Sequence, residues 1–226
     1  MKLHLTLSSL LLLACFKLSA QTNAIQFGIR AGVSSTWLSR TPGTDVQIRD
    51  AEKSGSGYFA GAFASFNVNR FSLQPAIIFN SLSSKTTEEV LSGDIVYRMY
   101  GKWRLYYIQV PVNLVYNIPV HGGKFYLGAG PYIGWALSGR FTPVSNESPG
   151  QSSPADFSFK AKFGSDERSN FKSFDYGANV VAGFEFDNGL IINAVHNLGL
   201  ANIEVGNYPY RKTRTRNLGI ALGYKF

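Results

Sequence analysis

Residues 174–186 read FDYGANVVAGFEF, a segment in which apolar side chains recur at every second position. One face carries Phe174, Tyr176, Ala178, Val180, Ala182, Phe184 and Phe186. The other face carries Asp175, Gly177, Asn179, Val181, Gly183 and Glu185. Successive side chains of a β-strand point to opposite faces of a sheet, so the segment predicts a strand with one apolar and one mainly polar face. Strands of about ten residues with this alternation are typical of transmembrane β-barrels.

The same alternation recurs along the chain and predicts about eight strands. They fall near residues 25–39, 57–68, 70–84, 96–118, 123–139, 172–186, 189–200 and 213–226. The connections are short at 67–70, 119–123 and 187–189 and long at 40–56, 85–95, 140–171 and 201–212. We therefore predict an all-β fold, a transmembrane antiparallel up-and-down β-barrel of about eight strands. Short turns and both termini are expected in the periplasm, and long loops outside the cell.

Three prolines fall inside predicted strands and bear on the register. Pro75, Pro111 and Pro131 each lack the backbone N–H that a ladder hydrogen bond needs. We interpret them as β-bulges or bends of the strands.

The composition agrees with strands that have one face in lipid. Hydrophobic residues make up 45% of the 226 residues and aromatic residues 14%, and there are 23 glycines. Charged residues reach only 16%, against about 25% in soluble proteins. After residue 20 no stretch approaches 18 consecutive apolar residues, so the sequence predicts no transmembrane helix there.

The first 20 residues, MKLHLTLSSLLLLACFKLSA, predict a secretory signal peptide, and residues 21–226 then form the barrel domain. A membrane-anchor helix is the alternative, although Lys17 interrupts the run short of the ~20 apolar residues that a span needs. Cys15 lies in LLAC, which also resembles a lipoprotein cleavage site that would leave Cys15 lipidated. Cleavage after Ala20 instead removes the only cysteine, so the mature chain has no disulfide.

The polar faces of the strands predict a network inside the barrel. Its expected members are Arg30, Gln74, Gln109, Asp175, Asn179, Glu185 and Lys225. Because an isolated buried charge costs several kcal/mol, we expect Arg30 and Lys225 to be matched by Glu185 or Asp175. Eight strands leave an interior that side chains can fill, which favours a filled lumen over the alternative of a narrow pore or small-ligand site.

The last long loop concentrates positive charge at the predicted extracellular rim, at Arg211, Lys212, Arg214 and Arg216. These residues are candidates for binding lipopolysaccharide phosphates, because arginine holds phosphate in a bidentate manner. Generic surface charge is the alternative. The formal net charge is +8, and in an exported chain such a balance favours anionic lipid or sugar phosphates over nucleic acid.

The loop at 140–171 is rich in Ser, Pro, Gly and charged residues, which indicates a mobile surface loop. Its unusually apolar members, Phe157, Phe159 and Phe163, leave a ligand or partner contact as the alternative.

The sequence contains no motif of a known catalytic, metal or cofactor site. There is no phosphate-binding loop, no His-Glu-x-x-His run and no nucleophile elbow. His121 and His196 are expected at opposite rims and cannot share a metal ion. His196 with a loop serine is the only candidate for rim hydrolase chemistry, and an interfacial anchoring role fits it better. We therefore expect a protein that is not an enzyme and has no cofactor.

Most of the chain resembles the PorT-like outer-membrane β-barrel family. The resemblance lies in YYIQVPVNLVYNIP (106–119), KFYLGAGPYIGWALSGR (124–140), FDYGANVVAGFEFDNGLIINAVHNLGLANI (174–203) and RNLGIALGYKF (216–226). The first strands add FGIRAGVSSTWLS (27–39) and GYFAGAFASFNVNRFSLQPAIIFNS (57–81). The resemblance implies a small barrel, often of unassigned function, whose namesake takes part in protein secretion across the outer membrane. The chain departs from the family at three inward positions. Family members often carry Glu at the positions of Ala76 and Gln109, and Arg at the position of Val195.

These patterns favour a non-enzymatic outer-membrane barrel with a structural, adhesive or assembly role. A narrow pore or carrier for a small solute, or an accessory component of a secretion system, are the alternatives. The expected location is the outer membrane, reached through the general secretory pathway, with lipopolysaccharide and the assembly machinery as partners. In resembling barrels that machinery recognises a C-terminal aromatic strand, which implies an assembly signal at Tyr224 and Phe226.

Overall fold

The computed structural model describes residues 25–41, 53–92, 95–143, 158–166, 168–205 and 212–226. The predicted signal peptide lies outside these residues. Eight long strands are β1 (Gln26–Thr41), β2 (Lys53–Val68), β3 (Phe71–Ser92), β4 (Ile95–Val120), β5 (Gly123–Pro143), β7 (Phe174–Phe186), β8 (Leu190–Gly199) and β9 (Lys212–Lys225). A two-residue strand, β6 (Phe159–Lys160), pairs with the end of β5.

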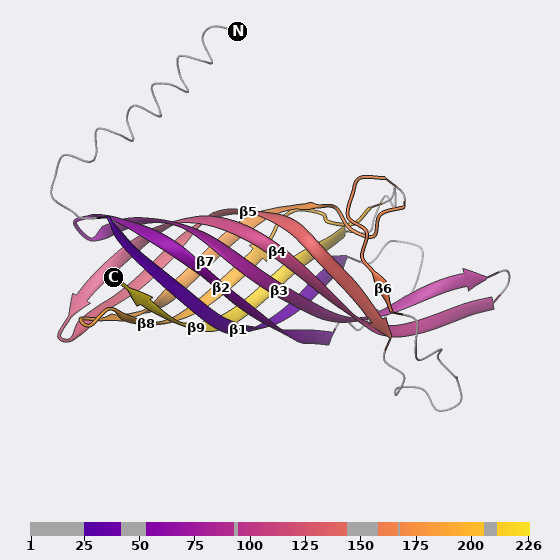
Figure 1. Ribbon diagram of the computed structural model, residues 1–226, viewed down its shortest axis with the longest axis horizontal. Coiled ribbons are helices and arrows are strands. Elements are labelled where there is room, and N and C mark those ends of the chain that lie inside the picture. The colour runs from indigo at the N-terminus through magenta and orange to yellow at the C-terminus, as the bar shows by residue number, and fades with distance from the viewer. Residues whose placement is uncertain (1–24, 42–52, 93–94, 144–157, 167, 206–211) are drawn as a thin grey trace, which may run out of the picture.

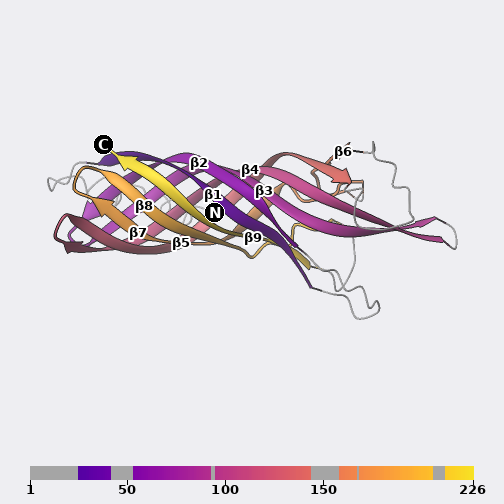
Figure 2. The same cartoon turned by 90° about the horizontal axis from the view of Figure 1, so that it is seen from below.

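The eight long strands close into an antiparallel barrel (Figures 1 and 2). Each long strand pairs with the next one along the chain, and β1 pairs with β9 from Gly28↔Lys225 to Thr41↔Lys212. Closure leaves no strand of this ring with an unpaired edge. The predicted up-and-down barrel of about eight strands is therefore confirmed. Among the described residues, no helix is long and apolar enough to cross a membrane.

The barrel has a turn end and a loop end. At the turn end, three tight connections join β2 to β3, β4 to β5 and β7 to β8. Asn69, Gly122 and Gly189 have φ angles of 53°, 83° and 86° in these turns, a left-handed conformation that glycine and asparagine tolerate best. The C-terminus lies at the same end, on the left of Figure 1. The opposite end of the barrel, where β6 lies, is the loop end.

The outer wall carries an apolar band. On β9, for example, Leu218, Ile220 and Leu222 are 51%, 66% and 61% exposed. The residues between them, Gly219 and Ala221, are buried toward the lumen. The alternation that predicted the strands therefore corresponds to an outward apolar face and an inward face.

Aromatic side chains border the apolar band at both ends. The loop-end girdle comprises Tyr58, Phe79, Tyr106, Trp135 and Phe174, whose neighbouring rings lie 5.7 to 6.2 Å apart. The turn-end girdle comprises Phe71, Tyr116, Phe125, Phe184, Phe186, Tyr224 and Phe226. Ten residues separate Tyr106 from Tyr116 on β4. At about 3.3 Å per residue and a tilt of about 40°, this span is roughly 25 Å high, the height of a transmembrane barrel's apolar band.

Two expectations about the strands are corrected. The predicted long loop at 85–95 is a hairpin, because β3 continues to Ser92 and β4 begins at Ile95. Figure 1 shows this hairpin extending beyond the rest of the barrel at the loop end. Residues 85–92 pair with 95–102 in an unbroken ladder, so β-pairing continues there past the level at which the other strands end.

The prolines are not bulges. The pairing numbers stay in step past Pro75, Pro111 and Pro131, and only single stretches of the ladders are interrupted beside them. A missing N–H therefore removes a local bridge without moving the register. The register shifts instead lie between Ser54 and Tyr58 and between Tyr106 and Tyr107.

Candidate functional site in the barrel lumen

Six side-chain amides from five strands form a hydrogen-bonded chain across the middle of the lumen. They are Asn80 on β3, Gln109 and Asn113 on β4, Asn179 on β7, Asn197 on β8 and Asn217 on β9. Gln109 Oε1 is the acceptor on which two arms converge, from Asn80 Nδ2 at 2.6 Å and from Asn197 Nδ2 at 3.0 Å. All six side chains are buried. We call this chain the amide plug.

The amide plug fills the lumen at its centre. Asn113 Nδ2 donates to Asn179 Oδ1 at 2.6 Å, and Asn179 in turn donates to Asn197, so the arm crosses from β4 to β8. Hydrogen bonds between neighbouring amides offset the cost of burying these polar groups away from water. The cavity beside the plug measures only about 10 Å³, about the room that one water molecule needs.

Arg30 enters this central region from β1 and lines the same cavity as Gln109 and Asn179. Its guanidinium carbon lies 5.8 Å from the centroid of the Phe63 ring, and its Nε has no hydrogen-bond partner. Within the described part of the chain Arg30 forms no ion pair, so the expected match with Glu185 or Asp175 is not found. Both carboxylates are held elsewhere by closer partners.

Asp175 is fully buried toward the loop end of the lumen. Its Oδ2 accepts hydrogen bonds from Thr215 Oγ1 at 2.7 Å and from the Tyr132 hydroxyl at 3.1 Å. Its Oδ1 and the nearby Tyr107 hydroxyl have no hydrogen-bond partner. Asp175 is thus partnered by hydroxyl groups rather than by a cation.

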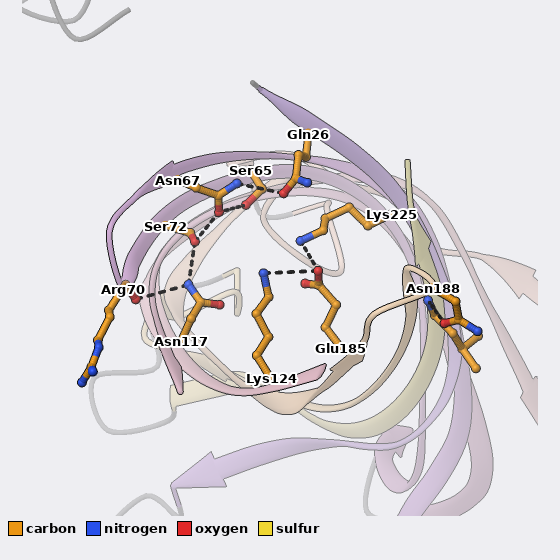
Figure 3. Close-up of polar contacts among 11 residues, drawn as sticks. Gln26, Ser65, Asn67, Arg70, Ser72, Asn117, Lys124, Glu185, Asn188 and Lys225 are labelled. Carbon is orange, nitrogen blue, oxygen red and sulfur yellow. Dashed lines mark hydrogen bonds and ion pairs between the residues drawn. The ribbon is translucent and has the colours of Figure 1, made fainter. Parts of the chain in front are cut away.

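Glu185 gathers two lysines at the turn end. Its Oε1 lies 3.2 Å from Lys124 Nζ and also contacts Lys225 Nζ. Figure 3 shows the three side chains meeting inside the ring of strands. They line a recess of about 510 Å³ that extends to Gln26 and Phe226. The lumen is therefore filled at its centre but opens into a recess at the turn end.

A polar ladder joins the first four strands beside this recess (Figure 3). Asn67 Oδ1 accepts hydrogen bonds from Ser65 Oγ at 3.0 Å and Ser72 Oγ at 2.6 Å. Asn67 Nδ2 donates to Gln26 Oε1 at 2.9 Å, and Asn117 Nδ2 donates to Ser72 Oγ at 2.7 Å. Inward polar residues of β1 to β4 therefore bond to one another rather than to solvent.

An aromatic cap packs into the loop end. Its buried members are Leu38, Leu82, Trp103, Leu105, Tyr107, Phe141, Phe171, Ala201 and Ile203. The Trp103 ring is central, with ring centroids at 4.9 Å from Phe171, 5.0 Å from Phe141 and 5.5 Å from Phe159. The backbone N–H of Ala161 donates to Gly139 and that of Lys172 to Ile203, which ties residues 158–173 to the barrel.

Part of the predicted mobile loop at 140–171 is folded against the loop end of the barrel. Residues 140–143 continue β5, and residues 158–171 fold back onto the loop end. Phe159 and Phe163 pack against the cap, so their apolar character serves burial within the chain. Phe157 and residues 144–156 lie outside the described residues.

The predicted rim cations on β9 differ in their surroundings. Lys212 is exposed, while Arg214 and Arg216 are half-buried. Arg216 Nη1 donates to the carbonyl oxygens of Gly199 at 2.5 Å and Thr215 at 3.2 Å. Arg211 lies outside the described residues.

The remaining predicted lumen residue, Gln74, is half-buried on β3 and stands in register with Asn113. His121 is exposed at the turn end, and His196 Nδ1 lies 2.9 Å from the carbonyl oxygen of Asn217. Among the described residues, no three His, Cys, Asp or Glu side chains gather as metal ligands.

Sequence reasoning missed the partners of Asp175 and the aromatic cap. Thr215 shares the inward parity of Asn217, which is a signal that could have found it. Tyr132 follows the outward Pro131, so the same alternation places it inward. The cap has no such signal, because it joins residues from β1, β3, β4, β5 and two connecting segments.

The chain was compared with known families and proteins. Residues 19–204 match the family model described as outer membrane protein beta-barrel domain. No curated protein sequence matches the chain.

Solved structures align with the chain at low identity. Ail, the attachment invasion locus protein of Yersinia pestis, in complex with the heparin analogue sucrose octasulfate, is 14% identical over 90% of this chain and 100% of that chain, with a TM-score of 0.41. Neisserial surface protein A is 15% identical over 88% and 97%, with a TM-score of 0.45. OprG from Pseudomonas aeruginosa is 14% identical over 90% and 96%, with a TM-score of 0.46.

Proposed function

The chain belongs to the outer membrane protein beta-barrel domain family, and on that premise we propose a non-enzymatic barrel that works through its outer wall and its loop end. It is an integral outer-membrane protein. The role we propose is structural, adhesive or in assembly, with a lumen that serves stability rather than transport.

The amide plug is the observation that carries this proposal. Six buried amides from five strands occupy the centre of the lumen and leave a cavity of about 10 Å³. Wide aqueous channels need about sixteen strands, whereas the interior of an eight-stranded barrel is narrow enough for side chains to fill. The aromatic cap adds a second layer toward the loop end.

We further propose that the turn end faces the periplasm and the loop end the cell exterior, as in other barrels with short and long connections. On this orientation Arg211, Lys212, Arg214 and Arg216 stay candidates for lipopolysaccharide phosphates. The assembly machinery is the proposed reader of Tyr224 and Phe226, and export by the general secretory pathway is proposed from residues 1–20.

Planar-bilayer recording tests the filled lumen. The purified barrel is expected to give no stable channel, because no continuous water path passes the amide plug. Heat-modifiable gel migration of the same sample checks that the barrel is folded. Reproducible unitary currents from folded protein would overturn the proposal in favour of the narrow pore or carrier.

The PorT-like secretion role is a narrower proposal within the same family and rests on the sequence resemblance alone. Affinity capture from native outer membranes tests it. Stoichiometric recovery of secretion components supports an accessory role, and recovery of lipid and assembly factors alone speaks against it.

A further inference from the structure

Six cations stand in two adjacent rows on the outer wall near the loop end. They are Lys53, Lys85 and Lys102 in the first row and Arg104, Arg140 and Lys160 in the second. Members of each row are direct partners across neighbouring strands, from β2 to β4 in the first and from β4 to β6 in the second. Lys102 and Arg104 are two residues apart on β4 and share a face, so the rows form one surface. We call it the basic wall.

The basic wall faces outward. Trp103 and Leu105 alternate with its members on β4, and both are buried in the aromatic cap. Five of the six cations are exposed, and Lys102 is half-buried. The same strand segments therefore carry aromatic residues inside and positive charge outside.

Nothing in the described part of the chain neutralises this surface. None of the six cations forms an ion pair with a described residue. The rows end on neutral partners, Thr142 opposite Lys102 and Ser83 opposite Arg104. Arg140 Nη1 donates to Ser158 Oγ at 3.3 Å, a neutral contact. Like charges placed directly opposite each other destabilise a sheet, so among the described residues the arrangement carries a cost that an external anion would offset.

The height of the basic wall points to the anion. Arg104 lies two residues and Lys102 four residues beyond Tyr106 of the loop-end girdle. At about 3.3 Å per residue and a tilt of about 40°, these positions are roughly 5 and 10 Å above the girdle. Aromatic girdles mark the boundary between acyl chains and headgroups, and the headgroup layer is about 5 to 8 Å thick. Arg104 thus lies within the headgroup layer, and Lys102 lies just beyond it, on the side away from the acyl chains.

We propose that the basic wall binds the phosphate groups of an anionic glycolipid in the outer leaflet. The inference rests on the proposed orientation, with the loop end outside the cell. The guanidinium groups of Arg104 and Arg140 each match a phosphate in a bidentate manner, and the lysines add point charges around them. The site is separate from the β9 cations, because its members lie on β2 to β6.

Height also favours a lipid over a soluble polyanion. A soluble ligand is free to use charges anywhere on the loops. The six cations instead occupy two adjacent register rows that begin directly beyond the girdle, where the phosphates of a glycolipid lie.

The test compares two triple variants of the full chain, purified in zwitterionic detergent. The wall variant carries Arg104→Gln, Arg140→Gln and Lys160→Gln. The matched control carries Arg70→Gln, Arg168→Gln and Lys172→Gln, which removes the same charge from exposed positions outside the rows. Native mass spectrometry measures binding of bisphosphorylated lipid A, with its dephosphorylated form as the lipid control.

We expect the wall variant to bind bisphosphorylated lipid A about tenfold or more weakly, because it loses three charge-assisted contacts, and the control variant to bind like the wild type. The three proteins should bind dephosphorylated lipid A equally well. Equal binding of lipid A by the wall variant would overturn the proposal. Tighter binding of a sulfated polysaccharide than of lipid A would also overturn it, in favour of a soluble polyanion.

Thermal unfolding separates binding from a merely structural role. Without lipid, the wall variant should unfold at the same or a higher temperature than the wild type, since opposed like charges are removed. Added lipid A should raise the midpoint of the wild type and the control but not of the wall variant. A wall variant that is less stable without lipid contradicts the proposal. Planar-bilayer recording of the wall variant tests the filled lumen independently of lipid binding.

Discussion

The guanidinium of Arg30 lies over the Phe63 ring in a part of the lumen that holds one water-sized cavity. A cation–π contact contributes about 0.5 to 2 kcal/mol, whereas burying an ion costs several kcal/mol. The ring therefore does not offset the desolvation of Arg30. Glu185 cannot help, because two lysines already hold it at the turn end.

Gln109→Glu is expected to leave the barrel about as stable as the wild type at neutral pH, because attraction to the Arg30 guanidinium offsets the several kcal/mol that burying the new carboxylate costs. The carboxylate keeps both hydrogen bonds that Gln109 Oε1 accepts, from Asn80 and Asn197, and adds a negative charge beside Arg30. Urea unfolding in detergent measures the change.

Arg30→Met supplies the control for this substitution. In the Arg30→Met background the same Gln109→Glu change should destabilise the barrel by several kcal/mol, since the buried carboxylate then has no cation. Gln109→Met should destabilise, because it leaves Asn80 and Asn197 donors without an acceptor. Equal effects of Gln109→Glu in both backgrounds would contradict the charge argument.

At the scale of elements, the aromatic cap is a folded layer that the barrel does not need for closure. Residues 158–173 reach the cap through Phe171, which is buried against Trp103 and Ile203. The β5–β7 pairing from Gly123↔Phe186 to Trp135↔Phe174 is complete without that segment. The cap and the barrel are therefore expected to open separately.

Phe171→Ala should release residues 158–173 while leaving the barrel closed. Truncating a buried Phe costs about 3 to 5 kcal/mol, and the loss removes the contact with Trp103 by which this segment is held in the cap. Limited proteolysis should cut the variant in this segment and leave its heat-modifiable migration intact. The control Lys172→Ala, which changes an exposed neighbouring residue, should resist proteolysis as the wild type does. Loss of heat-modifiable migration in the Phe171 variant would refute the separation.

The residue that follows strand β9, Phe226, contributes little packing to the finished barrel. Phe226 is 70% exposed, and its backbone N–H donates to Phe27 at 2.8 Å. Its ring touches Tyr224 on the outer wall with centroids 5.5 Å apart. Packing therefore does not account for the position of this aromatic residue, which is consistent with the assembly signal proposed above.

Deletion of Phe226 should lower the amount of barrel in the outer membrane several-fold while the purified, folded barrel keeps nearly wild-type stability. Surface labelling in cells measures the first quantity and thermal unfolding the second. Ile220→Ala, which trims an exposed residue of the same strand, serves as the control. Normal surface levels after the deletion would contradict the hypothesis that Phe226 is part of an assembly signal.

For the whole molecule, the lumen is arranged as three layers along the barrel axis. The turn-end recess with Glu185 comes first, the amide plug second and the aromatic cap third. A conducting path has to pass the plug and the cap together. In planar-bilayer recording, the Gln109→Gly and Phe171→Ala single variants should therefore give no ionic current. Only the variant that combines both substitutions should show brief currents.

Much of this arrangement could be predicted from alternation. The strand at 174–186 placed Asp175, Asn179 and Glu185 inward, and all three contact other inward residues in the lumen. Their partners could not be predicted, because Asn179 bonds to Asn113 and Asn197, far from it in the chain. The hairpin at 85–95 and the folded residues 158–166 and 168–171 were missed because composition reports only polarity. The hairpin is held by pairing between β3 and β4, and the folded residues by packing into the aromatic cap.

The sequence by itself determined the strands, the inward and outward faces, and closure into a barrel with short turns at one end. These are local properties, since a period of two and a turn residue need only their neighbours in the chain. Only the tertiary structure decided which inward residues meet, as when Asn217 reaches Asn80 across 137 residues. It also decided that six cations share two rows, because the register around a closed sheet follows from all its strands together.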